Sequence, residues 1–147
     1  MGNIKVGIRN LSDNAMPGYA TQGSSGLDVR AWINEPITLN SLERILVPTG
    51  LFIEIPEGYE AQMRPRSGLA IKHGLTCLNS PGTIDSDYRG ELKVILVNLS
   101  NESQVIHPGD RIAQLVFQQV AMIEWDERME LSDTLRGEGG FGHTGKQ

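Results

Sequence analysis

Apolar residues recur at every second position in several short segments of this chain, and turn residues bound each segment. The alternation is clear at 4–8 (Ile-Lys-Val-Gly-Ile) and at 27–31 (Leu-Asp-Val-Arg-Ala). A period of two places successive side chains on opposite faces of a strand, as in a half-buried sheet. The alternation therefore predicts strands at 4–8 and 27–31. Longer runs of β-forming residues predict further strands at 44–47, 51–55, 59–63, 91–99 and 111–125.

Proline and glycine punctuate the chain between these segments and mark turns. They stand at Pro17-Gly18, Glu35-Pro36, Thr49-Gly50, Pro56-Glu57-Gly58, Pro81-Gly82, Arg89-Gly90 and Pro108-Gly109. Short strands with regularly recurring turns are typical of an all-β sandwich or barrel. Helical periodicity is weak, and the best helix candidate is 67–72, with Ser67 as its expected N-cap.

The last twelve residues differ in composition from the rest of the chain. Residues 136–147 read RGEGGFGHTGKQ and hold five of the 17 glycines. Such a segment buries no core, so we expect a β domain at 1–135 followed by a mobile glycine-rich tail. A plain disordered terminus explains this composition most simply. The alternative is a lid that closes over an active site, because glycine amides approach a ligand closely and cradle phosphate.

Length and charge limit the possible functions. The chain has 147 residues, which is the size of one domain. Its net charge of −5 argues against a general polyanion binder, so we expect no nucleic-acid partner. The single cysteine, Cys77, excludes an internal disulfide and a cysteine-based zinc cage. No apolar run approaches the roughly 18 residues of a membrane span, and we expect a soluble cytoplasmic protein without membrane partners.

Two arginines and a serine stand together just before the predicted helix, in the segment 64–69 (Arg-Pro-Arg-Ser-Gly-Leu). Backbone amides at a helix start and nearby guanidinium groups bind anions such as phosphate. The segment lacks the Walker A spacing, and a surface loop with solvated arginines is an equally good interpretation.

The segment 79–90 (NSPGTIDSDYRG) combines turn residues with groups that carry chemistry. The amide of Asn79 can pair with a base edge, because it donates and accepts hydrogen bonds together. The carboxylate of Asp85 can orient and deprotonate a water, and the ring of Tyr88 can pack against a sugar. The alternative is an ordinary turn in which the Asp and Asn side chains hydrogen-bond to the backbone of the turn itself. That alternative does not explain why Asp85 follows Ile84, an apolar residue that we expect to face the core.

Two further segments are ambiguous when taken singly. Residues 109–115 (GDRIAQL) begin a strand after a Pro-Gly turn. A buried strand in which neighbouring residues hydrogen-bond the Gln114 side chain is enough to explain this segment. Asp28 is the one charge in an otherwise apolar stretch, and a turn or an ion pair explains it.

Taken together, these five segments resemble the five motifs of the trimeric dUTPase family, in the same order and at similar spacing. They lie at 24–31, 64–75, 78–98, 109–117 and 136–145. RPRSGLA, GTIDSDYRG and GDRIAQL are highly specific, and RGEGGFG adds to them. Ser25 stands where the family usually has Ala, and His143 where it has Ser or Thr. The second departure transfers a γ-phosphate contact to Thr144 or to backbone amides.

The resemblance implies a fold, an assembly and a reaction. The fold is a β jelly roll, and three chains form a homotrimer with shared active sites. The reaction is hydrolysis of dUTP to dUMP and pyrophosphate by attack of water on the α-phosphorus, which lowers dUTP and supplies dUMP for thymidylate synthesis. Mg²⁺ is the implied cofactor, held by phosphate and water oxygens with no direct protein ligand.

The resemblance also assigns roles to individual residues. Asp85 activates the water, and Arg136 acts as an arginine finger. The implied substrate-binding set is Arg66, Ser67, Gly68, Asn79, Gly82, Thr83, Ile84, Tyr88, Lys93, Gln114, Phe141 and Gly142. The implied supporting residues are Asp28, Arg64 and Asp110.

Within that set, the implied contacts divide by the part of the nucleotide. Asn79 and the backbone of 82–84 read uracil, which Phe141 covers. Tyr88 packs on deoxyribose and leaves no room for a 2′-hydroxyl. The segment 66–68 and Gln114 hold the phosphates of a nucleotide bound at a neighbouring subunit's site.

Two other functions compete with this one. A dCTP deaminase shares the fold but carries a catalytic glutamate about where this chain has Ile95, and Phe or Trp in place of Tyr88. Without that glutamate, deamination lacks an acid–base group. A non-enzymatic jelly-roll binding module is the second alternative, but it would not need Asp85, Arg136 and a glycine-rich tail together.

Overall fold

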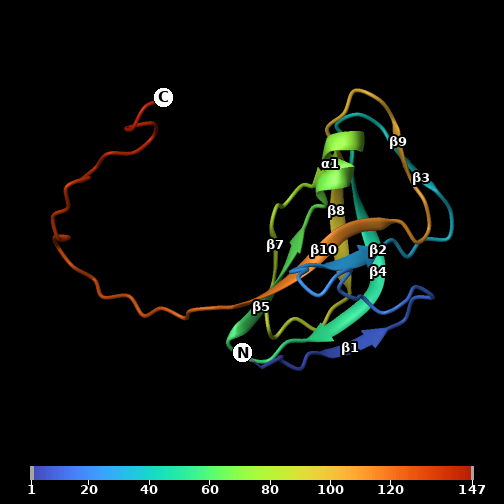
Figure 1. Ribbon diagram of the computed structural model, residues 1–147, viewed down its shortest axis with the longest axis horizontal. Helices are drawn as coiled ribbons and strands as arrows, with labels where there is room; N and C mark the ends of the chain where they lie inside the picture. Colours follow the sequence, from blue (N-terminus) through green and yellow to red (C-terminus); the bar gives the residue numbers. More distant parts are fainter. Residues whose placement is uncertain (1, 147) are drawn as a thin grey trace.

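The computed structural model describes residues 2–146, which form ten strands and one short helix (Figure 1). The strands are β1 (Gly7–Asn10), β2 (Leu27–Arg30), β3 (Ile37–Leu39), β4 (Arg44–Glu54), β5 (Tyr59–Arg64), β6 (Leu75–Cys77), β7 (Gly82–Ile84), β8 (Leu92–Asn98), β9 (Gln104–Ile106) and β10 (Arg111–Gln119). The helix α1 (Ser67–His73) lies between β5 and β6. This confirms the predicted all-β class with one short helix.

Eight of the strands form two four-stranded antiparallel sheets. One sheet has the order β1-β4-β8-β6 and the other β2-β10-β5-β7, while β3 and β9 pair separately. Alternate residues of these strands are buried in one core, as Leu92, Val94 and Leu96 of β8 illustrate. Eight strands in two facing sheets are the arrangement of a jelly roll.

The predicted strand boundaries are wrong in three places. The strand expected at 4–8 is displaced, because β1 spans Gly7–Asn10 and residues 4–6 lie outside any strand. The segments 44–47 and 51–55 belong to one strand, β4, which continues through the expected turn at Thr49-Gly50. The register with β8 shifts there by a bulge, and the buried Thr49 hydroxyl donates to the Leu92 carbonyl oxygen at 2.5 Å. The last strand ends at Gln119 instead of residue 125, because its pairing with β5 stops at the pair Gln119–Tyr59.

The helix is confirmed, but its predicted N-cap is wrong. Arg66 is the capping residue, in an extended conformation without a side-chain cap hydrogen bond, and Ser67 is the first helical residue. The helix ends at Gly74, whose φ of 65° is left-handed and whose amide donates to the Ala70 carbonyl oxygen. Within the described part of the chain, no helix has the length and apolar character that a membrane span requires.

After β10 the chain leaves the two sheets, and residues 120–146 contain no helix or strand (Figure 1). Nearly all of their side chains are exposed, including six large apolar ones between residues 122 and 135. These six are Met122, Ile123, Trp125, Met129, Leu131 and Leu135. The boundary at residue 135 and the mobility of the tail stay predictions.

Candidate active site

One cavity of about 450 Å³ collects most of the residues expected to bind uracil and deoxyribose. Its wall is built by β7 and the loops on either side of it, together with β8 and one residue each from β4 and β5. The seven candidates in its wall are Asn79, Gly82, Thr83, Ile84, Asp85, Tyr88 and Lys93. Ile95 also lines it, so an apolar side chain stands where a deaminase would need its glutamate.

Strand β7 presents backbone groups at the edge of this cavity. It pairs with β5 on one side only, because it is the last strand of its sheet. The other side of an edge strand offers N–H and C=O groups to a ligand. Asn79 packs close to this strand, since a Cβ atom added to Gly82 would lie 2.9 Å from the Asn79 Nδ2 atom. The edge and the amide together can read the hydrogen-bonding pattern of a base.

Asp85 follows directly after β7 and is exposed. Its neighbour Ile84 is partly buried against the core, as the sequence predicted. Among residues 2–146, no Lys, Arg or His nitrogen lies within 4.0 Å of the Asp85 carboxylate. Asp85 also lines a second cavity of about 700 Å³, so water can reach it from there. The carboxylate is therefore free to accept a hydrogen bond or a proton from water.

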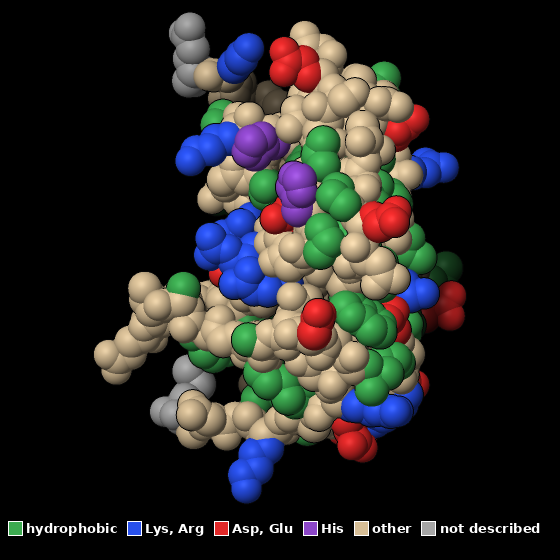
Figure 2. All heavy atoms as spheres, turned by 90° about the vertical axis from the view of Figure 1, so that its right-hand side faces the viewer, with side chains coloured by type: hydrophobic (Ala, Val, Ile, Leu, Met, Phe, Trp, Pro, Cys, Tyr) green, Lys and Arg blue, Asp and Glu red, His purple; other side chains and the backbone are tan. Residues whose placement is uncertain are grey.

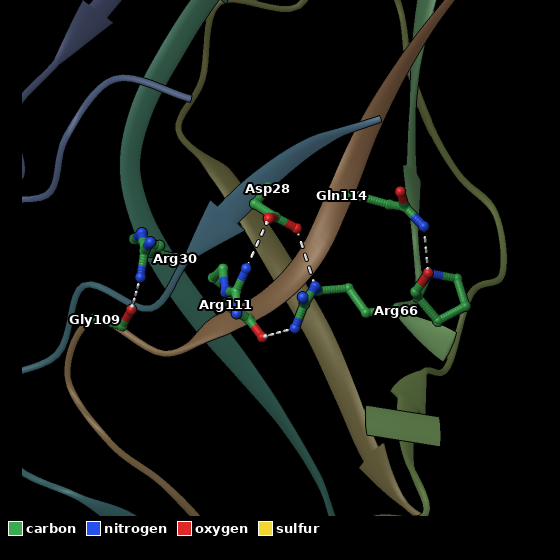
Figure 3. Close-up of polar contacts among 7 residues, drawn as sticks. Asp28, Arg30, Arg66, Gly109, Arg111 and Gln114 are labelled. Atoms are coloured by element: carbon green, nitrogen blue, oxygen red, sulfur yellow. Dashed lines mark hydrogen bonds and ion pairs between the residues drawn. The ribbon is translucent and has the colours of Figure 1, made fainter. Parts of the chain in front are cut away.

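A second group of candidates forms a separate cleft of about 510 Å³ at the start of α1. The expected phosphate ligands Arg66, Ser67, Gly68 and Gln114 line it, and so do Asp28, Arg64 and Ser25. Gln114 donates from Nε2 to the Pro65 carbonyl oxygen at 3.0 Å (Figure 3). Arg64 is held by Gln62, whose Oε1 atom accepts from Arg64 Nε and Nη2 at 3.0 and 2.7 Å.

A single carboxylate organises the arginines of this cleft (Figure 3). Asp28 Oδ1 accepts from Arg66 Nε at 3.0 Å, and Asp28 Oδ2 accepts from Arg111 Nη1 at 3.4 Å. Arg66 also donates from Nη1 to the Arg111 carbonyl oxygen at 3.3 Å. Figure 2 shows Lys and Arg side chains packed into one group on this face, while other charges are scattered. The sequence analysis missed Arg111, although it stands within the noted segment GDRIAQL.

Asp110 lies outside both of these pockets. Its Oδ2 atom accepts from the His107 amide at 2.8 Å, and its own amide donates to the His107 carbonyl oxygen. It therefore closes the turn that precedes β10, and its supporting role in the site stays a prediction. The structure does not bring Arg136, Phe141 or Gly142 to either pocket. Arg136 donates to the Gly139 carbonyl oxygen at 2.6 Å, and the ring of Phe141 is fully exposed.

The two pockets are separate on a single chain. They share no lining residue. Strand β5 contributes Met63 to the first and Arg64 to the second. Successive residues of a strand point to opposite sides of the sheet, so β5 stands between the two pockets.

A family model described as dUTPase matches residues 12–145 of the chain. The chain belongs to the dUTPase family. It is 62% identical over 146 residues to the deoxyuridine 5′-triphosphate nucleotidohydrolase of Fusobacterium nucleatum, covering 99% of this chain and 100% of that protein. It is 58% identical over 142 residues to the protein of the same name from Finegoldia magna, covering 97% of this chain and 99% of that protein. The predicted family and enzyme class are confirmed, and they are preferred to the two alternatives, a dCTP deaminase and a non-enzymatic binding module.

Solved dUTPase structures share the fold. The Staphylococcus bacteriophage 80alpha dUTPase with dUpNHpp superposes with a TM-score of 0.84 at 26% identity, over 98% of this chain and 100% of that one. A point mutant of the dUTPase from the S. aureus phage phi11, described with a structural Mg(II) ion, gives a TM-score of 0.79 at 24% identity, over 88% and 100%. The second likeness concerns the fold alone.

Proposed function

We propose that this chain hydrolyses dUTP to dUMP and pyrophosphate by attack of water on the α-phosphorus, which lowers dUTP and supplies dUMP for thymidylate synthesis. The observation that carries the proposal is the 450 Å³ cavity, where Asn79 and the β7 edge meet the Asp85 carboxylate and the Tyr88 ring. The groups that we propose to read the base, to pack on the sugar and to activate the water thus line one cavity.

Base selection rests on hydrogen bonds at the β7 edge. Asn79 and the backbone of 82–84 offer both donors and acceptors, which match the uracil edge. A wrong base leaves buried polar groups unpaired, and that penalty discriminates strongly. Tyr88 packs on the deoxyribose and excludes a 2′-hydroxyl, while Lys93 contacts the nucleotide from β8.

Asp85 orients the attacking water and takes its proton. Its carboxylate has no cationic partner within 4.0 Å among the described residues and lies at the boundary of two cavities. Phosphoryl transfer depends on an oriented nucleophile and on positioned positive charge. Arg66 supplies such charge together with Ser67, Gly68 and Gln114, and Arg136 adds a further guanidinium.

The donor set fits a magnesium ion that the substrate carries. Among residues 2–146 no group of three or more His, Cys, Asp or Glu side chains is placed to hold a metal, and Asp28 is engaged with two arginines. Mg²⁺ keeps several waters and binds phosphate oxygens readily. A Mg²⁺ ion bound together with the triphosphate would supply positive charge to offset the negative charge of the transition state.

The active enzyme is a homotrimer in which each site is shared. Two observations support this proposal. The uracil cavity and the phosphate cleft have no residue in common on one chain, which is the arrangement expected if a second chain brings its cleft to the first chain's cavity. The exposed apolar side chains of 122–135 are also a surface of the kind that assemblies bury. The tail from Arg136 to Gly145 then closes over a site of the trimer, with Phe141 on the base.

We place this activity in the cytoplasm, without nucleic-acid or membrane partners. The net charge of −5 and the free, buried thiol of Cys77 support this placement.

One assay tests the reaction against its competitor. Purified protein with Mg²⁺ is given dUTP or dCTP, and pyrophosphate and ammonia are measured in parallel. The proposal predicts pyrophosphate and dUMP from dUTP and no ammonia from dCTP. Ammonia release, or no product from dUTP, would contradict it.

A further inference from the structure

The ring of Tyr88 is folded back onto the backbone of its own loop. Its Oη atom donates to the Glu91 carbonyl oxygen at 3.1 Å. Between these two residues stands Gly90. A Cβ atom added to Gly90 would lie 2.5 Å from Tyr88 Cζ and 2.7 Å from Cε1, and it would also overlap Oη. The ring therefore occupies the space that any other side chain at position 90 would need.

Backbone conformation does not explain this glycine. The φ angle of Gly90 lies outside the left-handed region, in contrast to that of Gly58 or Gly109. A left-handed φ is therefore not the reason for glycine at this position. The feature that requires glycine is the contact with Tyr88.

Two other side chains of the site also occupy the space that a Cβ atom on a nearby glycine would need. A Cβ atom at Gly82 would lie 2.9 Å from Asn79 Nδ2. One at Gly26 would lie 3.0 Å from Gln114 Cδ and would overlap Oε1. By contrast, a Cβ atom added at Gly18 or Gly23 would meet no heavy atom within 4 Å.

We propose that Gly90 is a positioning residue that sets how far the Tyr88 ring reaches into the uracil and deoxyribose cavity. Tyr88 and Glu91 line this cavity, whereas Gly90 does not, so Gly90 stands behind the ring. Carbon atoms pack at about 3.5–4.0 Å, so a methyl group at position 90 displaces the ring by about 1 Å. Because Tyr88 lines the cavity and Gly90 does not, we expect this displacement to move the ring toward the space for the sugar. This proposal rests on the proposed function, in which Tyr88 packs on deoxyribose.

The test is a double-mutant cycle measured with dUTP and UTP. The variants are Gly90→Ala, Tyr88→Ala, Tyr88→Phe, both double variants and the control Gly18→Ala. A misplacement of about 1 Å costs up to about 100-fold in efficiency, so we expect Gly90→Ala to raise KM for dUTP at least about tenfold, with kcat nearly unchanged. In the Tyr88→Ala background the same change raises KM less than about twofold, because the displaced ring is absent. Tyr88→Phe, which removes the overlapping Oη atom, recovers part of the loss.

The outcomes separate this proposal from the function on which it rests. An equal rise in KM in both backgrounds, or no rise at all, would overturn the role of Gly90. If Gly90→Ala fails to fold, the proposal requires the double variant with Tyr88→Ala to fold, and its failure would also overturn it. The UTP to dUTP efficiency ratio of Tyr88→Ala tests the sugar contact by itself. An unchanged ratio would refute that contact and leave the measured coupling between the two residues to stand.

Discussion

Replacing Asp28 with Asn removes the negative charge that holds two arginines of the phosphate cleft in place. The carboxylate accepts from Arg66 at 3.0 Å and from Arg111 at 3.4 Å, so the two guanidinium groups lie on one anion. Asparagine keeps the shape and one acceptor oxygen but compensates neither charge. We expect Asp28→Asn to lower both stability and affinity for dUTP.

The geometry sets the size of the effect. The Asp28 and Arg66 side chains are only 27% and 25% exposed, so their hydrogen bond is worth about 1.5–2 kcal/mol as a partly buried, charge-assisted contact. Arg111 is 48% exposed and its contact is longer, and a pair of that kind contributes less than about 1 kcal/mol. The free energy of unfolding therefore falls by about 2 kcal/mol. Loss of the fixed arginine positions raises KM for dUTP about tenfold.

Urea unfolding at one fixed protein concentration measures the stability, because an oligomer unfolds in a concentration-dependent way. The matched control is Glu54→Gln, which breaks the Glu54–Arg89 pair of 3.5 Å whose side chains are 72% and 54% exposed. Exposed pairs contribute little, so the control leaves stability and KM nearly unchanged. Added salt reduces the Asp28 effect only slightly, because a partly buried pair is weakly screened.

A result in which Asp28→Asn matches the control in both measurements would refute this reasoning. It would mean that the arginines hold their positions without the carboxylate. The cleft would then be organised by the backbone of α1 and β10.

Other changes to the chain probe the catalytic group, the tail and the buried thiol. Asp85→Asn keeps dUTP binding, measured by calorimetry, but lowers kcat at least about 100-fold, because the water loses its proton acceptor; near-normal kcat would exclude that role. Deletion after Leu135 leaves a folded trimer with poor turnover. In the full chain, the tail amides are protected from hydrogen exchange only when a non-hydrolysable dUTP analogue is bound; protection without ligand would exclude a lid. Burial raises the pKa of the Cys77 thiol to about 11, so the folded state keeps a proton that the unfolded state releases above about pH 9. Stability relative to Cys77→Ala therefore falls by about 2–3 kcal/mol between pH 9 and 11, as urea unfolding at each pH will show, and parallel profiles would contradict it.

The sequence predicts the strands β2 and β5, in which apolar and polar residues alternate throughout, and β8, which contains a continuous apolar run. It fails where local signals conflict with pairing. Thr49 and Gly50 have the composition of a turn, but in β4 they form a bulge that the Thr49 hydroxyl ties to β8. The apolar residues beyond 119 form a run rich in strand-forming residues, but no strand of the described chain pairs with them. The three-residue strands β3, β6, β7 and β9 are too short to show a period at all.

In the candidate site, too, some residues could be predicted from the sequence and others could not. That Asn79, Asp85 and Tyr88 line one cavity was predictable, because they lie in one contiguous motif around β7. Arg111 was not predictable, because its contact with Asp28 depends on the register of two strands and joins residues 83 positions apart in the chain. That register pairs Gln114 with Asp28 and brings the arginine onto the carboxylate. Strand pairing is a tertiary property, and periodicity does not report it.

Subunit complementation tests the shared site most directly. Asp85→Asn and Arg66→Ala chains, each inactive alone, are unfolded together, refolded as a 1:1 mixture and assayed for pyrophosphate release from dUTP. If every site takes Asp85 from one chain and Arg66 from another, random assembly of a symmetric trimer leaves both intact in about one quarter of the sites. The account predicts recovery of about one quarter of the activity of the unmodified enzyme. A mixture that stays as inactive as its components would show that both residues serve a site from the same chain, and the shared active site would be wrong.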